Sequence, residues 1–135
     1  MLEEVVNKQN AKKKVSKNDF CMLKVIGAGT WGKVMLVRHN ESQKLFAMKV
    51  IKRAKITTQK QVEHTKTELR ILERLDHPFI VKLKYAFHDP KKLTLVLDYC
   101  CGGELFFYIK ACKRFKEDVV AFYASNILLA IRELH

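Results

Sequence analysis

The sequence has few cysteines, and none of them is spaced for a structural metal site. The four cysteines are Cys21, Cys100, Cys101 and Cys112, of which two are adjacent and no two form a C-x-x-C pair. The five histidines also fall at no spacing typical of metal ligands. Because zinc sites depend on such ligand pairs, we expect no zinc site and no bound metal in this chain.

Long apolar runs are missing as well. The apolar stretch at residues 121–131 contains Asn126 and is too short for a bilayer, which needs about 20 apolar residues. The first residues, Met1-Leu-Glu-Glu4, do not have the basic-then-apolar order of a secretory signal. We therefore expect no transmembrane segment and an intracellular protein with reduced thiols. The expected location is the cytoplasm, and the nucleus is the alternative.

Acidic residues are scarce relative to basic ones. The chain has 14 Asp and Glu against 26 Lys and Arg, a formal net charge of +12, which suits an anionic partner such as phosphate, nucleic acid or an acidic membrane. Nucleic-acid binding would also need a basic face with aromatic stacking platforms or a groove-reading element. Neither pattern is visible, so we expect no nucleic-acid partner.

The 135 residues, of which 48% are hydrophobic, suffice for a single folded domain. Short β-branched runs predict strands, and apolar residues recurring every three or four positions predict helices. Asp76-His-Pro78 ends the first helix, because proline disfavours helical geometry in the residue before it. The expected order is strands at 20–26, 33–38 and 45–51, a helix at 57–75, strands at 83–87 and 93–99, and helices at 104–111 and 117–135.

The segment Gly27-Ala-Gly29-Thr-Trp-Gly32 contains G-x-G-x-x-G, a pattern shared by dinucleotide-binding folds and kinases. In a dinucleotide-binding fold the third glycine opens a helix, whereas here a strand-like run follows it. The segment is therefore expected to close a hairpin, where glycines let backbone N–H groups approach an anion. A glycine-rich hairpin turn that binds nothing is the alternative.

Lys49 lies on the third predicted strand, and the strand pleat would direct its ammonium beneath the glycine loop. A buried lysine is costly unless it is paired. Glu68, on the following helix and just before the apolar Leu69, is the expected partner. Such a pair would hold the lysine where nucleotide phosphates could meet it, while an ordinary surface salt bridge is the alternative.

These motifs resemble the AGC-group serine/threonine protein kinases, of the Akt, serum/glucocorticoid-regulated and ribosomal-protein kinase kinds. The most specific matches are His64-Thr-Lys-Thr-Glu68 and Gly102-Gly-Glu-Leu-Phe106. The resemblance implies an α+β fold in which a five-stranded antiparallel sheet and one helix form a kinase N-lobe at 20–99. It further implies a hinge at 100–103 and the first two helices of an incomplete C-lobe at 104–135. Residues 1–19 are polar and rich in lysine, and this composition predicts a flexible basic lead-in.

The resemblance also implies an ATP site. The side chains of Val34 and Ala47 would cover the adenine ring, Leu97 would be the gatekeeper, and the backbone of Asp98 and Cys100 would bond the adenine edge. Glu104 matches a contact to ribose or to a substrate arginine, although an acidic residue in the first turn of a helix explains it equally well. The complete expected set is Ile26, Gly27, Ala28, Gly29, Thr30, Trp31, Gly32, Lys33, Val34, Ala47, Lys49, Leu97, Asp98, Cys100 and Glu104.

Two positions depart from the family pattern. Trp31 replaces the usual Phe or Tyr at the tip of the loop, a bulky apolar change that should still shield phosphates. Lys116 stands where relatives often have a serine that caps the next helix, at a cost of about 1 kcal/mol.

The family's catalytic segments, His-Arg-Asp and Asp-Phe-Gly, do not occur in these 135 residues. The resemblance implies a full-length parent that phosphorylates protein Ser or Thr with ATP and Mg²⁺, and that has protein substrates and an activating kinase as partners. This chain alone is predicted to be inactive, with no catalytic residue assigned. The alternative is a non-catalytic module that binds nucleotide or a partner, to which the apolar face of the last helix is an objection, because such patches favour aggregation.

Overall fold

The computed structural model describes residues 15–29 and 32–135, which form two compact units. The first unit contains the described residues up to Leu75 together with Lys82–Tyr99, and the second contains Asp76–Val81 and Cys100–His135. The chain thus passes between the two units after Leu75, after Val81 and after Tyr99. The hinge expected at 100–103 remains a prediction. Most of the predicted lead-in, and the predicted site residues Thr30 and Trp31, lie outside the described residues.

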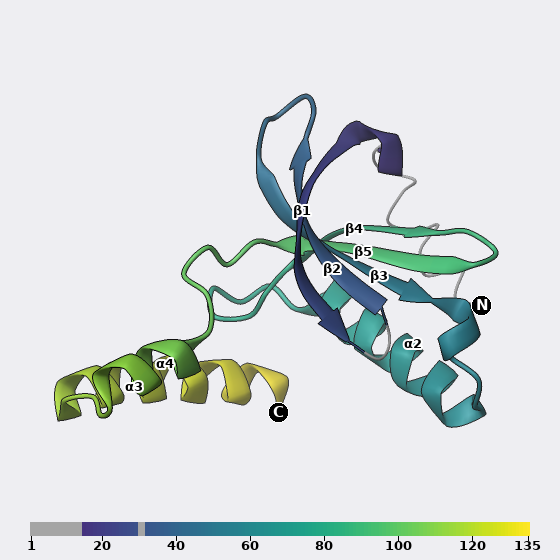
Figure 1. The fold of residues 1–135 in the computed structure, drawn as a ribbon. Coiled ribbons are helices and arrows are strands. Elements are labelled where there is room, and N and C mark those ends of the chain that lie inside the picture. The colour runs from purple at the N-terminus through teal and green to yellow at the C-terminus, as the bar shows by residue number, and fades with distance from the viewer. Residues whose placement is uncertain (1–14, 30–31) are drawn as a thin grey trace. The chain divides into compact units, whose positions relative to one another are not determined.

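The first unit is built around a five-stranded antiparallel sheet with the strand order β1-β2-β3-β5-β4 (Figure 1). The predicted α+β architecture is confirmed. β1 continues to Gly29 instead of ending at Ile26, because its pairing with β2 extends as far as Gly29 opposite Gly32. The strands are β1 (Phe20–Gly29), β2 (Gly32–His39), β3 (Leu45–Lys52), β4 (Leu83–His88) and β5 (Lys92–Asp98).

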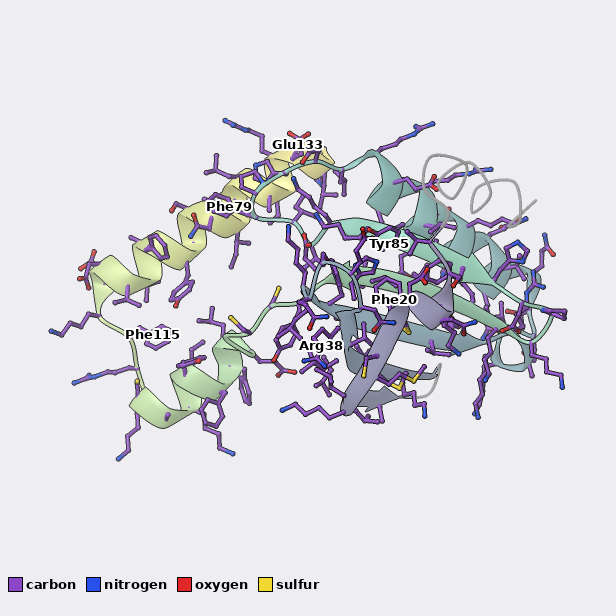
Figure 2. All side chains as sticks on the ribbon, turned by 90° about the horizontal axis from the view of Figure 1, so that it is seen from above. Phe20, Arg38, Phe79, Tyr85, Phe115 and Glu133 are labelled. Atoms are coloured by element: carbon purple, nitrogen blue, oxygen red, sulfur yellow. The ribbon has the colours of Figure 1, made fainter. Side chains whose placement is uncertain are left out.

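One face of the sheet carries an aromatic core centred on Phe20. The Phe20 ring makes an edge contact with Phe46 and Tyr85, with centroids 6.1 and 5.7 Å away, and Figure 2 shows the labelled Phe20 and Tyr85 over the sheet. Val15 packs against the same core. The buried members of this core are Phe20, Met35, Val37, Phe46, Met48, Val50 and Val96.

Residues 15–19 are structured, in contrast to the flexible lead-in expected there. Ser16 caps a short 3-10 helix, η1 (Lys17–Asp19), in which its own N–H donates to Asp19 Oδ2 at 2.6 Å. This reciprocal capping satisfies backbone groups that would otherwise need water. The capping box and the burial of the neighbouring Phe20 together hold this segment against the sheet.

The other face of the sheet is covered by α2 (Gln59–Arg74), as Figure 1 shows. Thr58 caps the helix through the N–H of Gln61, whose side chain in turn accepts from Thr58 N–H, so α2 starts two residues after the predicted position. Leu69, only 1% exposed, is the buried residue of α2. It packs in a second core that also contains Ile51, Ala86, Leu93 and Leu95.

The turn between β4 and β5 is organised by Asp89. Its carboxylate accepts hydrogen bonds from the backbone N–H groups of Lys91 and Lys92 at 2.7 and 2.8 Å. The Lys91 N–H is the largest influence, and these bonds lower the pKa of Asp89 below its ordinary value. The predicted turn at 89–92 is confirmed.

The second unit contains α3 (Leu105–Cys112) and α4 (Glu117–Leu134). Phe115, in the connection between them (Figure 2), stacks on Tyr123 of α4 with the ring centroids 5.9 Å apart. Neither helix has a buried residue, so the apolar face predicted for the last helix is exposed, with Leu128 at 65%. Among the described residues, none of the helices has both the length and the apolar character needed to span a membrane.

We expect Lys116→Ser to stabilise α4 by about 1 kcal/mol. Lys116 is the N-cap of α4 and makes no side-chain capping bond, whereas a serine oxygen could accept from the backbone N–H groups of the first turn. Chemical denaturation followed by circular dichroism measures the change. Lys116→Ala, which removes the same charge without supplying a cap, is the matched control, and equal stability of the two variants would contradict the capping argument.

Candidate functional site

The glycine loop connects β1 and β2 as the tip of a hairpin, as the strand-like flanks predicted. Opposite partners at its base are Gly27 with Val34, and Gly29 with Gly32. A hollow beneath the hairpin is lined by residues of the loop and its flanks together with Lys49, Val50 and Ile51 of β3. The strand pleat therefore places the Lys49 side chain below the glycine loop, in the same unit.

The three glycines of the loop differ in whether packing requires a glycine at their position. A Cβ on Gly32 would lie 1.8 Å from the backbone carbonyl oxygen of Val50, so only glycine fits where β2 approaches β3. On Gly29 a Cβ would have none of the described atoms within 4 Å, and on Gly27 it would make an ordinary 3.6 Å contact with Val34. Packing within the described residues therefore explains Gly32 but leaves room for side chains at Gly27 and Gly29.

Lys49 and Glu68 form an ion pair, with Lys49 Nζ donating to Glu68 Oε1 at 2.9 Å. The two side chains are 33% and 48% exposed, so the burial expected for the lysine is not observed. Leu69, next to Glu68, takes the buried position on α2, which leaves the Glu68 carboxylate exposed. Such an exposed pair contributes only about 0.2–1 kcal/mol to stability, so stability alone does not explain the pairing.

The residues expected to cover an adenine ring lie on the same sheet face as Lys49. Ala47 is two residues from Lys49 on β3, and it is paired directly with Leu97 of β5, while Val34 is paired with Lys49. Directly opposed residues share a face of a sheet. Val34, Ala47 and Leu97 are all half-buried, so this apolar row is only partly covered within the first unit.

Asp98 points its side chain to the other face. It is paired with Phe46 of the aromatic core, and its Oδ1 lies 3.2 Å from Lys84 Nζ. The side chain is thus engaged away from the row formed by Val34, Ala47 and Leu97. This arrangement is compatible with the backbone role that the resemblance assigns to Asp98.

Two of the expected residues, Cys100 and Glu104, belong to the second unit. Cys100 is exposed and its carbonyl accepts from Gly103 N–H at 3.5 Å, which closes a turn. Glu104 is the N-cap of α3, has extended backbone angles and makes no side-chain capping bond. It therefore precedes the helix instead of lying in its first turn, but its carboxylate is still next to the N-terminus of α3, so the helix-dipole explanation remains open.

Three lysines near the loop had no signal in the sequence. Lys52, Lys55 and Lys92 line a hollow together with Gly29, Gly32 and Lys33. Lys52 and Lys92 are directly opposed on β3 and β5, and only the register of the sheet brings them together.

Three further residues of the expected ATP site are exposed. Lys33 and Ala28 are exposed at the loop, and Ile26 is exposed on β1.

In the described part of the chain, no group of three or more His, Cys, Asp or Glu side chains could hold a metal ion. The expectation that this chain binds no metal by itself remains a prediction. Among the described residues, no cluster of carboxylates therefore lies beside the ion pair of Lys49 and Glu68.

The protein kinase domain family matches residues 20–135 of this chain. The chain is 49% identical to Protein kinase 2 of Dictyostelium discoideum over 133 residues, covering 98% of this chain and 28% of that protein. It is 44% identical to the RAC-beta serine/threonine-protein kinase of Mus musculus over 135 residues, covering 100% of this chain and 28% of that kinase. It is 43% identical to the serine/threonine-protein kinase akt-1 of Caenorhabditis elegans over 122 residues, covering 90% and 23% of the two chains.

The chain thus spans 28% or less of the length of each of these relatives. The family match extends over the sheet, α2, α3 and α4, and the relatives named above include serine/threonine kinases of the Akt type. The resemblance seen in the glycine loop and in Gly102-Gly-Glu-Leu-Phe106 is confirmed, and the chain belongs to the protein kinase family.

Proposed function

We propose that this chain is the ATP-binding portion of a serine/threonine protein kinase. The observation that carries the proposal is the hollow beneath the hairpin, where Lys49 lies below glycines that packing does not require. Glycines at positions 27 and 29 leave the backbone accessible to a ligand. An ammonium and a glycine-rich backbone facing one hollow are the groups that bind nucleotide phosphates in this family.

The charge around the hollow supports an anionic ligand. Lys33, Lys52, Lys55 and Lys92 line a second hollow with Gly29 and Gly32. Lys52 and Lys92 belong to the sheet face opposite Lys49, but clustered cations at the loop raise the local concentration of anions. Glu68 holds Lys49 by one ammonium hydrogen, and an ammonium has three donors. Two donors of Lys49 therefore remain for phosphate oxygens.

The row formed by Val34, Ala47 and Leu97 supplies an apolar surface on the same face as Lys49. We assign the adenine ring to this row, and its edge to the backbone of Asp98 and Cys100. Leu97 is the proposed gatekeeper, and Glu104 the proposed contact to ribose or to a substrate arginine. Since Asp98 is engaged by Lys84 through its side chain, the assignment to its backbone carbonyl leaves that ion pair intact.

We expect Lys49→Met to lower the affinity for ATP about tenfold to a hundredfold, because a hydrogen bond to a charged group is worth about 1.5–3 kcal/mol. Affinity for adenosine, which has no phosphate, should not change. Isothermal titration calorimetry with both ligands measures the difference. The melting temperature should change little, because the pair with Glu68 is exposed.

Lys84→Met is the matched control for this prediction. Lys84 has a similar exposure, 36% against 33%, and is also ion-paired, but its partner Asp98 belongs to the opposite face of the sheet. Its replacement should leave ATP affinity unchanged. An equal loss in both variants, or ATP affinity no greater than adenosine affinity in the unchanged chain, would contradict the phosphate role of Lys49.

For the full-length parent we propose transfer of phosphate from ATP to Ser or Thr of protein substrates, with Mg²⁺ bound by residues outside this sequence and an activating kinase as a further partner. We propose that the protein is located in the cytoplasm, with the nucleus as the alternative location, and that it has no nucleic-acid partner. The chain by itself is proposed to be inactive, because it contains no catalytic-loop aspartate. A radiolabelled-phosphate assay on a generic protein substrate tests the inactivity, which any Lys49-dependent incorporation would overturn.

The second candidate function is a non-catalytic module that binds nucleotide or a partner. The exposed apolar side chains of α3 and α4, such as Phe106 and Leu128 at 69% and 65%, count against an independent soluble module, because patches of this kind favour aggregation. Size-exclusion chromatography distinguishes the two candidates. A monodisperse chain with one cooperative melting transition would favour the module.

A further inference from the structure

Two adjacent cysteines, Cys100 and Cys101, lie in the turn that precedes α3. Both are exposed and neither forms a disulfide. Cys101 and Gly102 are the central residues of the turn that Gly103 N–H closes onto the Cys100 carbonyl. The turn thus presents a dithiol to solvent.

The surroundings leave the dithiol uncrowded while fixing the turn that carries it. Tyr108 of α3 donates its hydroxyl to the Gly102 carbonyl at 2.6 Å, which ties the turn to the helix. A Cβ on Gly102 or on Gly103 would meet none of the described atoms within 4 Å. The backbone next to the two exposed cysteines is therefore uncrowded.

We propose that Cys100 and Cys101 form a chelating site for a thiophilic trivalent centre, of which an organic arsenical is the representative class. Neighbouring Cα atoms are about 3.8 Å apart across a trans peptide, so two flexible thiol side chains can reach one atom. Chelation by two sulfurs makes the second bond intramolecular, which strengthens binding over a single thiol. Cys21 and Cys112 have no sequence neighbour that could do the same.

The reaction with phenylarsine oxide needs no oxidant. Two arsenic–sulfur bonds form and the arsenic–oxygen bonds break. The two thiol protons leave with that oxygen as water, and arsenic stays trivalent throughout. Two cysteines and one arsenical therefore give one cyclic adduct on the folded chain.

The adduct has a consequence that rests on the proposed function. If the backbone N–H of Cys100 binds the adenine edge, a bulky phenylarsenic group on that residue competes with ATP. Formation of the adduct does not depend on nucleotide binding. The two statements can therefore fail separately.

The test is intact-mass spectrometry of the full chain after treatment with phenylarsine oxide in excess glutathione. We expect one phenylarsenic group per chain, which survives the monothiol and is removed by ethanedithiol. Cys100→Ser and Cys101→Ser should each lose the adduct completely. A Cys21→Ser and Cys112→Ser double variant, which keeps the dithiol, should retain it.

The absence of an adduct on the unchanged chain, or its persistence in either single serine variant, would overturn the dithiol site. In a second measurement, saturating ATP should slow formation of the adduct at least tenfold. An adduct that forms equally fast with and without ATP, on a chain that calorimetry shows to bind ATP, would overturn the competition while leaving the site. A chain that binds no ATP but forms the adduct would support the site and contradict the proposed function.

Discussion

Leu69→Ala is expected to lower the free energy of unfolding of the first unit by about 2–5 kcal/mol, the usual cost of truncating a buried leucine. Leu69 is 1% exposed and is the buried residue through which α2 packs on the sheet. Truncation leaves a cavity beside Ile51, Leu93 and Leu95, and only partial collapse can fill it. Urea denaturation followed by circular dichroism measures the loss.

The same replacement should also weaken ATP binding, because Glu68 precedes Leu69 on α2 and holds Lys49 through a 2.9 Å contact. A helix that no longer packs at Leu69 allows Glu68 to move away from Lys49. Ile71→Ala is the control, since Ile71 is on the same helix but 43% exposed. Equal destabilisation by the two replacements would show that α2 is not anchored through Leu69.

Gly32→Ala is expected to destabilise the first unit by about 1–3 kcal/mol, the typical cost of overpacking. The added Cβ would lie 1.8 Å from the Val50 carbonyl oxygen, which is backbone and cannot turn aside as a side chain could. β2 would have to move away from β3 at the end where Gly32 is paired with Ile51. Thermal and urea denaturation both detect this change.

Gly29→Ala separates stability from function in the same loop. None of the described atoms lies within 4 Å of its added Cβ, so the stability should stay close to that of the unchanged chain. The affinity for ATP should nevertheless fall, because the methyl group occupies the space that the proposed function reserves for phosphate. Loss of stability in Gly29→Ala, or unchanged ATP affinity, would contradict this division of roles between Gly29 and Gly32.

Much of the fold followed from periodicity. The strands and helices begin and end within a few residues of their predicted bounds, because alternation of apolar residues and spacing of three to four positions reflect which side chains must leave water. The partners Lys49 and Glu68 were also predictable, since their strand and helix positions belong to a pattern shared with the kinase family. The structure of residues 15–19 was not predictable, because these residues are held by a capping box and by contact with a core that the sequence does not locate.

The sequence by itself determined the order of strands and helices, the hairpin around the glycines and the partnership of Lys49 with Glu68. Only the tertiary structure decided that Gly32 alone is required by packing, because the clash involves Val50 on a neighbouring strand. It also decided that the ion pair is exposed and that Lys52 and Lys92 are opposed beside the loop. Exposure and cross-strand register depend on residues distant in the chain, whereas sequence periodicity reports only on neighbours.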